Sequence, residues 1–155
     1  MQIAVLIHAC GKFISMKNSN ECGYTLIMST EIIGLSHLER EIIANVVRYN
    51  IRDFDYDMMQ LETEAGQDLA GVSDRTAITI LIAKLTAILR LANSMDKTHK
   101  SKLIDCRMAV REGQLVITTG YKGDLALESA SFEQKAAFFE EIFGIRPVLK
   151  QKRRV

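Results

Sequence analysis

The sequence contains no Trp and a single Pro in 155 residues, and its three Cys form no C-x-x-C pair. The missing cysteine pairs exclude a zinc ribbon and a thioredoxin-type redox motif. Cys10, Cys22 and Cys106 are an odd number at wide spacing. This pattern is typical of reduced, structural thiols, so we expect a cytoplasmic protein. The single Pro excludes a proline-rich linker or a collagen-like chain.

An excess of charge of one sign is also missing, because 20 Lys and Arg stand against 19 Asp and Glu, for a net charge of +1. This balance excludes a generally basic nucleic-acid binder, although local patches can still attract anions. Apolar residues make up 48% of the chain, which is enough for a buried core. The longest apolar run, residues 77–92, contains Lys84 and Arg90 and is shorter than the about 20 residues of a membrane helix. We therefore expect no membrane partner.

Helical patterns fill the first part of the chain. Residues 2–14 are apolar at helical spacing and predict the start of a buried helix. Ser36 and Glu39 form a capping box ahead of an amphipathic helix over residues 38–49. Ser73 is expected to cap a further long helix. The apolar positions of that helix run nearly all round, which predicts a central, buried helix.

The stretch between these helices is acidic. Residues 53–68 hold six acidic residues and no Lys or Arg. The stretch predicts a solvated loop with room for a short helix.

Short β-prone runs follow a polar connector near residue 98. Residues 103–110 and 114–119 flank a turn that contains Gly, which predicts a β-hairpin. A third and weaker strand is expected at residues 125–127.

A helix and a last strand complete the predicted tail. Ser131 opens a second capping box, and Gly144 ends the helix that follows. Residues 145–151 then form the last strand. The predicted fold class is mainly α with an α+β tail, with a helical domain over 1–98 and a small β-β-β-α-β domain over 103–152.

Two basic clusters are the candidate binding residues. They are Lys97, Lys100 and Lys102 in the connector, and Arg146, Lys150, Lys152, Arg153 and Arg154 at the end of the chain. Such clusters attract a linear polyanion, and salt weakens the attraction. Neither cluster contains an aromatic residue on which bases could stack, so we expect no nucleic acid as partner. The alternative is a solvated connector and a frayed tail.

Several motifs resemble one known family when they are taken in order. Residues 6–14 (LIHACGKFI) resemble the L-H-D-x-G-K motif of HD domains. Residues 35–50 (LSHLEREIIANVVRYN) resemble a helix that reads IANIARYH in relatives. Residues 89–99 (LRLANSMDKTH) resemble the R-L-A-D-x-L-D-R-S-H that ends the helical core. Together they resemble the C-terminal region of the exopolyphosphatase and guanosine pentaphosphate phosphatase family (Ppx/GppA).

This resemblance implies an HD-domain-like helical bundle followed by a small α/β unit. In the family the catalytic region is an N-terminal pair of actin-like ATPase-fold domains that use Mg. The chain would therefore be an accessory region with no catalytic residue and no cofactor of its own. Its implied partners are polyphosphate, the N-terminal catalytic domains and a second copy in a homodimer.

The HD-like motif also implies a vestigial metal site. His8 matches one expected ligand and Asp96 another, but Ala9 stands where an Asp belongs. Two ligands are too few to hold a divalent ion with an open position. We therefore expect His8 to be a core histidine and Asp96 to pair with Arg90 or Lys97.

Two alternatives from other functional classes stay open. The chain could be an HD-type metal phosphohydrolase of degraded sequence, which would retain a divalent metal lost on His8→Ala. It could also be a standalone scaffold or regulatory module that keeps only the fold.

Overall fold

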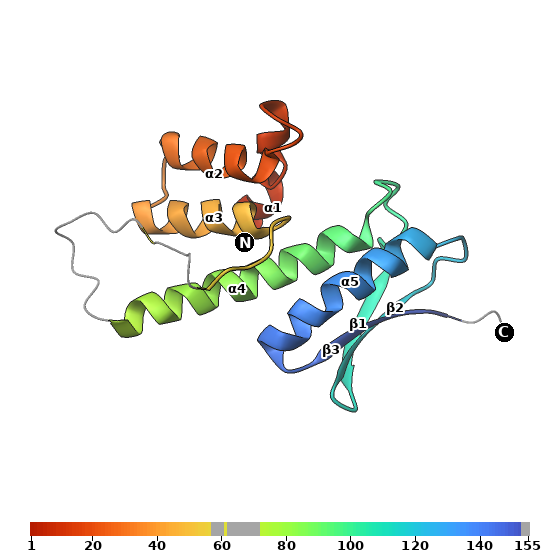
Figure 1. Cartoon of the computed structure of the whole chain (residues 1–155). Coiled ribbons are helices and arrows are strands. Elements are labelled where there is room, and N and C mark those ends of the chain that lie inside the picture. The colour runs from red at the N-terminus through yellow and green to blue at the C-terminus, as the bar shows by residue number, and fades with distance from the viewer. Residues whose placement is uncertain (57–60, 62–71, 153–155) are drawn as a thin grey trace. The chain divides into compact units, whose positions relative to one another are not determined.

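The computed structural model describes residues 1–56, 61 and 72–152 (Figure 1). Contacts divide the chain into two compact units, Met1–Thr86 and Ala87–Val155. The boundary falls inside the long helix α4 (Val72–Met95). The predicted division at residues 98–103 rested on composition and stays a prediction. The acidic stretch 53–68 lies mostly outside the described residues.

The first unit is helical, as the sequence predicted. Its elements before α4 are α1 (Gln2–Ile7), the 3-10 helix η1 (Cys10–Phe13), α2 (Ser19–Ser29) and α3 (His37–Tyr49). The capping box that begins α3 is confirmed. The Ser36 hydroxyl accepts from the N–H of Glu39 at 3.2 Å, and the Glu39 carboxylate accepts from the N–H of Ser36 at 2.9 Å. The apolar face of α3 is buried through Ile43, Val46 and Val47.

Two glycines let η1 approach α2 closely. A Cβ on Gly11 would lie 1.8 Å from the carbonyl oxygen of Ser19 and 2.5 Å from the nitrogen of Gly23. Both neighbours are backbone atoms, so no side-chain rotation relieves this overlap. Gly23 in turn faces Val47 of α3, whose Cγ1 would be 3.0 Å from an added Cβ. The glycine of the HD-like motif therefore has a packing role.

The helix predicted to start in residues 2–14 is present but is neither continuous nor buried. α1 ends at Ile7, and η1 follows after a turn at His8 and Ala9. Leu6 is 82% exposed and Phe13 is 95% exposed. Gly11, which lies in η1 after the break, is the residue that approaches α2 closely.

The prediction of a central helix buried all round is also wrong for α4. Ile80, Leu81 and Ile88 are exposed, whereas Ile82, Ala83 and Leu89 are buried. The helix begins at Val72, so Ser73 is its second residue and not the residue before it.

By length and composition alone, part of α4 could cross a membrane. This part is Arg75–Met95, and its mean hydropathy is 1.5. The indication is weak, because the core helix of a soluble protein has the same length and composition.

The second unit contains a three-stranded sheet and one helix after the end of α4. Its elements are β1 (Cys106–Arg111), β2 (Gln114–Thr119), α5 (Ala126–Phe143) and β3 (Arg146–Gln151). The strand order is β1-β2-β3, with β1 antiparallel and β3 parallel to β2. α5 is the crossover between the two parallel strands, as this topology requires. The fold class of a mainly α chain with a small α/β tail is confirmed.

The predicted hairpin is confirmed. Arg111 pairs with Gln114, and the two turn residues between them, Glu112 and Gly113, have φ of 50° and 74°. A two-residue loop with positive φ at both positions matches the twist of the strands, and Gly adopts it at low cost.

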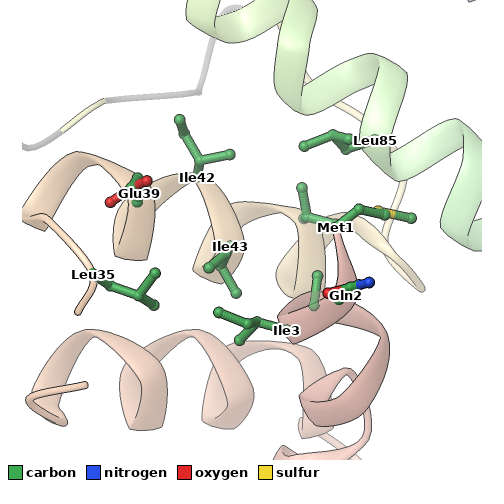
Figure 2. Close-up of a pocket in the computed structure, with 10 residues that line it drawn as sticks. Met1, Gln2, Ile3, Leu35, Glu39, Ile42, Ile43 and Leu85 are labelled. Atoms are coloured by element: carbon green, nitrogen blue, oxygen red, sulfur yellow. The ribbon is translucent and has the colours of Figure 1, made fainter. Parts of the chain in front are cut away.

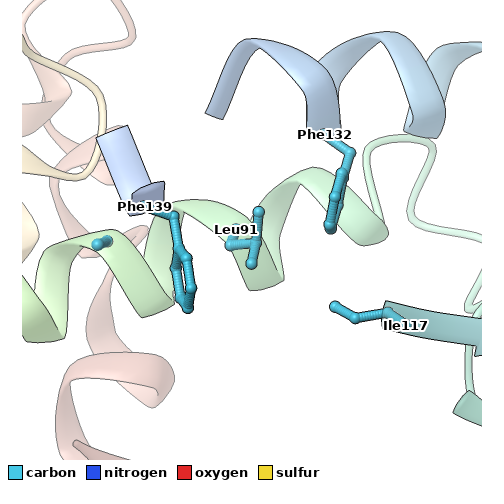
Figure 3. Close-up of a cluster of buried hydrophobic side chains, with 5 residues drawn as sticks. Leu91, Ile117, Phe132 and Phe139 are labelled. Carbon is cyan, nitrogen blue, oxygen red and sulfur yellow. The ribbon is translucent and has the colours of Figure 1, made fainter. Parts of the chain in front are cut away.

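The core of the second unit lies between α4, α5 and the sheet (Figure 3). Phe132 and Phe139 of α5 pack with Leu91 of α4 and Ile117 of β2. Ile117 is 1% exposed. Full burial of a side chain as large as Phe132 contributes about 1.5–3 kcal/mol.

The predicted strand at residues 125–127 and the capping box at Ser131 are both wrong. α5 begins at Ala126, and the carboxylate of Asp124 accepts the N–H of Ala126 at 2.8 Å. Ser131 therefore lies inside the helix. The end of α5 was predicted correctly, because Gly144 adopts the left-handed conformation (φ 69°) and its N–H donates to the carbonyl of Glu140.

Gly11→Ala is expected to destabilise the first unit by about 1–3 kcal/mol, because the new methyl group overlaps backbone atoms. Urea denaturation followed by circular dichroism measures this change. Gly120→Ala is the matched control, since an added Cβ there meets nothing within 4 Å. Equal stability of the two variants would contradict the close contact between η1 and α2.

Candidate functional site

His8 lies directly after α1 and is half-buried. Its Nδ1 donates to the carbonyl oxygen of Val5, 2.7 Å away. The ring is therefore held by the last turn of its own helix.

Asp96 lies directly after α4, in the second unit. Its carboxylate accepts the N–H of Ser101 at 2.9 Å, so its hydrogen-bond partner is a backbone group of the connector. The guanidinium of Arg90, one of the expected partners, lies 4.5 Å from the centre of the Phe138 ring.

Among the described residues, no three His, Cys, Asp or Glu side chains gather where they could hold a metal ion. This part of the chain does not fit the donor set that a divalent ion requires, so we derive no step through a metal. The expectation of no metal in this chain stays a prediction.

The connector lysines differ in their surroundings. Lys97 and Lys100 are exposed. Lys102 is held by Glu128 of α5, with Nζ 3.1 Å from the carboxylate and 2.9 Å from the carbonyl oxygen of Asp124. A lysine in such an ion pair is a poor ligand for an anion in solution.

Glu128 itself is fully buried, in the first turn of α5. Its carboxylate also accepts a short hydrogen bond from the hydroxyl of Thr98. This hydrogen bond is the largest influence on the pKa of Glu128. Burial opposes it and Lys102 adds to it, and together they lower the pKa to about 2. The group is therefore a charged structural anchor between the connector and α5.

The basic residues at the end of the chain also differ. Lys150 and Lys152 are exposed, whereas Arg153 and Arg154 lie outside the described residues. Arg146 forms ion pairs with Glu133 and Glu140 of α5.

Strand pairing reveals basic residues that the linear clusters did not include. Side chains alternate between the two faces of a strand, and paired residues share a face. Ile117 points into the core, so its neighbours on β2 point away from α5. We define the outer face of the sheet by these neighbours and their partners in β1 and β3: Arg107, Ala109, Arg111, Gln114, Val116, Thr118, Arg146, Val148 and Lys150.

The outer face carries four basic residues and no acidic residue. Arg107 and Lys150 flank Thr118, about 10 Å apart across the sheet, and Arg111 lies about 13 Å along the strand from Arg107. Within the described part of the chain, Arg107, Arg111 and Lys150 take part in no ion pair. These three cations are therefore available to a ligand.

A pocket of about 420 Å³ lies in the first unit (Figure 2). Apolar side chains dominate its lining, among them Ile3, Leu35, Ile42 and Leu85. The carboxylate of Glu39, also in the lining, is engaged in the capping box of α3. The side chains of the pocket therefore offer shape and apolar surface, and its one carboxylate is already engaged.

A comparison with models of protein families shows which family the chain belongs to. The family model described as Ppx/GppA phosphatase, domain III matches residues 1–136. The chain belongs to this family. A comparison with the curated proteins gives no match.

Membership makes the chain an accessory domain of the exopolyphosphatase family, as the sequence motifs indicated. The match covers all of the first unit and continues through β1, β2 and more than half of α5. The likeness to HD domains stays a prediction.

Stability is expected to fall as the pH drops from about 4.5 to about 2, since Glu128 must take up a proton on unfolding. Its folded pKa lies below the unfolded value, so this contribution is complete above pH 4.5 and is lost at low pH. Urea denaturation across this range measures the free energy of unfolding of the natural chain and of Glu128→Gln.

The difference between the two chains should shrink as the pH falls. Glu21 and Glu39, whose pKa values are also lowered, contribute equally to both chains and cancel. An identical pH dependence in the two chains would show that Glu128 is not the anchor.

Proposed function

We propose that this accessory domain binds polyphosphate or a similar phosphate polyanion, and that the outer face of the sheet contacts the chain of phosphates. The observation that carries the proposal is a set of three cations, Arg107, Arg111 and Lys150, that form no ion pair with any described residue, on a face without an acidic residue. Arginine and lysine are the side chains that bind phosphate, through bidentate and point-charge contacts respectively.

The chemistry of this face favours polyphosphate over a nucleic acid. The middle row of the outer face is aliphatic, with Ala109, Val116 and Val148, and the face carries no aromatic ring. Single-stranded nucleic acid gains much of its affinity from stacking of bases on aromatic rings. A phosphate polymer has no bases and needs only the cations.

The other exposed cations extend the same role. Lys97, Lys100 and Lys152 are exposed and would add long-range attraction for an anionic polymer. Arg153 and Arg154 keep the role that the sequence suggested for them. Lys102 already pairs with Glu128, so we expect its ammonium group to contribute less than the other cations.

The remaining expectations from the family also stay proposals. The catalytic domains and their Mg would belong to an N-terminal region, and two copies would form a homodimer. No observation favours the degraded metal phosphohydrolase over the accessory role, and a cytoplasmic location is retained from the cysteine pattern.

The reversal of charge at Arg107, Arg111 and Lys150, all to Glu, is expected to weaken polyphosphate binding at least about tenfold at low salt. Fluorescence anisotropy with labelled polyphosphate measures the affinity at several salt concentrations, and released phosphate is assayed in the same tubes. The natural chain should bind with an affinity that falls as salt rises, without releasing phosphate.

The matched control reverses the charge of Lys12, Lys17 and Lys84, three exposed lysines of the first unit. If both triple variants lose the same polyphosphate affinity, the loss comes from the change in net charge alone. That result would contradict a binding site on the sheet. Phosphate release by the natural chain would instead support a hydrolase. If neutralising Lys150, Lys152, Arg153 and Arg154 leaves the polyphosphate affinity unchanged, the end of the chain takes no part in binding.

A further inference from the structure

β1 is a free edge of the sheet. It pairs with β2 on one side, and within the described residues no strand pairs with its other side. Five of its six residues are exposed. An edge of this kind presents a row of unpaired N–H and C=O groups that another strand can join.

The opposite edge differs from β1. β3 contains Pro147, which cannot donate a hydrogen bond, and its Arg146 is engaged by two glutamates of α5. Proline is one of the devices that protect sheet edges from further pairing. β1 contains no proline, so each of its outward N–H groups can donate to an added strand.

The inner side of β1 carries uncovered apolar side chains. Met108 and Val110 share a face with Ile117 and Leu115 of β2, which pack in or against the core. Yet Met108 is 62% exposed and Val110 is 64% exposed. The core therefore covers the start of β1 at Cys106 but leaves Met108 and Val110 uncovered, and an added strand could bury these two residues.

The charge of β1 decides which partner fits. In a symmetric antiparallel pairing of two copies centred on Ala109, Arg107 of each copy would stand opposite Arg111 of the other. Like charges directly opposite each other are destabilising. This register therefore disfavours a second copy, and the two arginines favour a strand that carries carboxylates.

We infer that the edge of β1 binds an extended acidic peptide segment of another protein by strand addition. A residue of the added strand lies on the same face as the β1 residue opposite it, so the pairing specifies a sequence pattern for the peptide. Two acidic residues four positions apart face Arg107 and Arg111, and two apolar residues between them face Met108 and Val110. This inference goes beyond polyphosphate binding, because it requires the backbone edge and the two apolar residues.

The test uses labelled synthetic peptides and the whole chain. The probe is Glu-Val-Thr-Val-Glu between flanking glycines, and its matched control is Lys-Val-Thr-Val-Lys. Fluorescence anisotropy should show saturable binding of the acidic peptide, at least about tenfold tighter than the basic one. The double variant Arg107→Glu with Arg111→Glu should reverse this preference.

Two further variants separate strand addition from simple charge attraction. N-methylation of one alternate set of peptide nitrogens should abolish binding, whereas methylation of the other set should not, because only one set faces the edge. The double variant Met108→Ser with Val110→Ser should no longer bind the acidic peptide but should still bind polyphosphate. Its two substituted side chains are exposed, so we expect it to fold.

Three results would overturn the inference. They are the absence of saturable peptide binding, equal effects of both methylation patterns, and a natural chain that forms a dimer which the substitutions at Met108 and Val110 dissolve. The last result would assign the edge to a second copy. Polyphosphate binding is measured on the same samples, so its failure is recorded separately.

Discussion

The carboxylate of Glu128 is buried without contact to water, and Thr98 and Lys102 of the connector supply its partners. An unpaired charge in this position would be strongly unfavourable, so the connector must follow one path over the start of α5. That path ends a few residues before Cys106, where β1 begins. This ion pair therefore fixes the path by which the connector reaches the hairpin and the outer face of the sheet.

The sequence predicted the elements whose signals are local. The capping box of Ser36, the hairpin at Glu112 and Gly113 and the cap at Gly144 each need only a few neighbouring residues. The start of α5 was missed because a short apolar run at residues 125–127 suits a strand or a buried helix equally well. The longer pattern decides it: Leu125, Glu128, Phe132, Ala136 and Phe139 are all buried, at helical spacing.

The candidate site was harder to predict, because charge clusters along the chain differ from charge clusters in space. Lys102 belongs to a basic run, yet its ammonium group forms an ion pair with Glu128. Arg107 and Arg111 belong to no run, yet strand pairing sets them on one face with Lys150. Only the register of three strands reveals this, since a shift by one residue would turn each side chain to the other face.

The topology of the sheet has a consequence for the order in which it can form. The β1–β2 hairpin is local, so it can close within microseconds of its synthesis. β3 pairs with β2 only after the whole of α5 has been made. Until then β2 keeps an open edge, and Ile117 lacks the full cover of the finished core. We therefore expect the docking of its last strand to be the slow step of folding in this unit, and an incomplete chain to expose the open edge of β2 to aggregation.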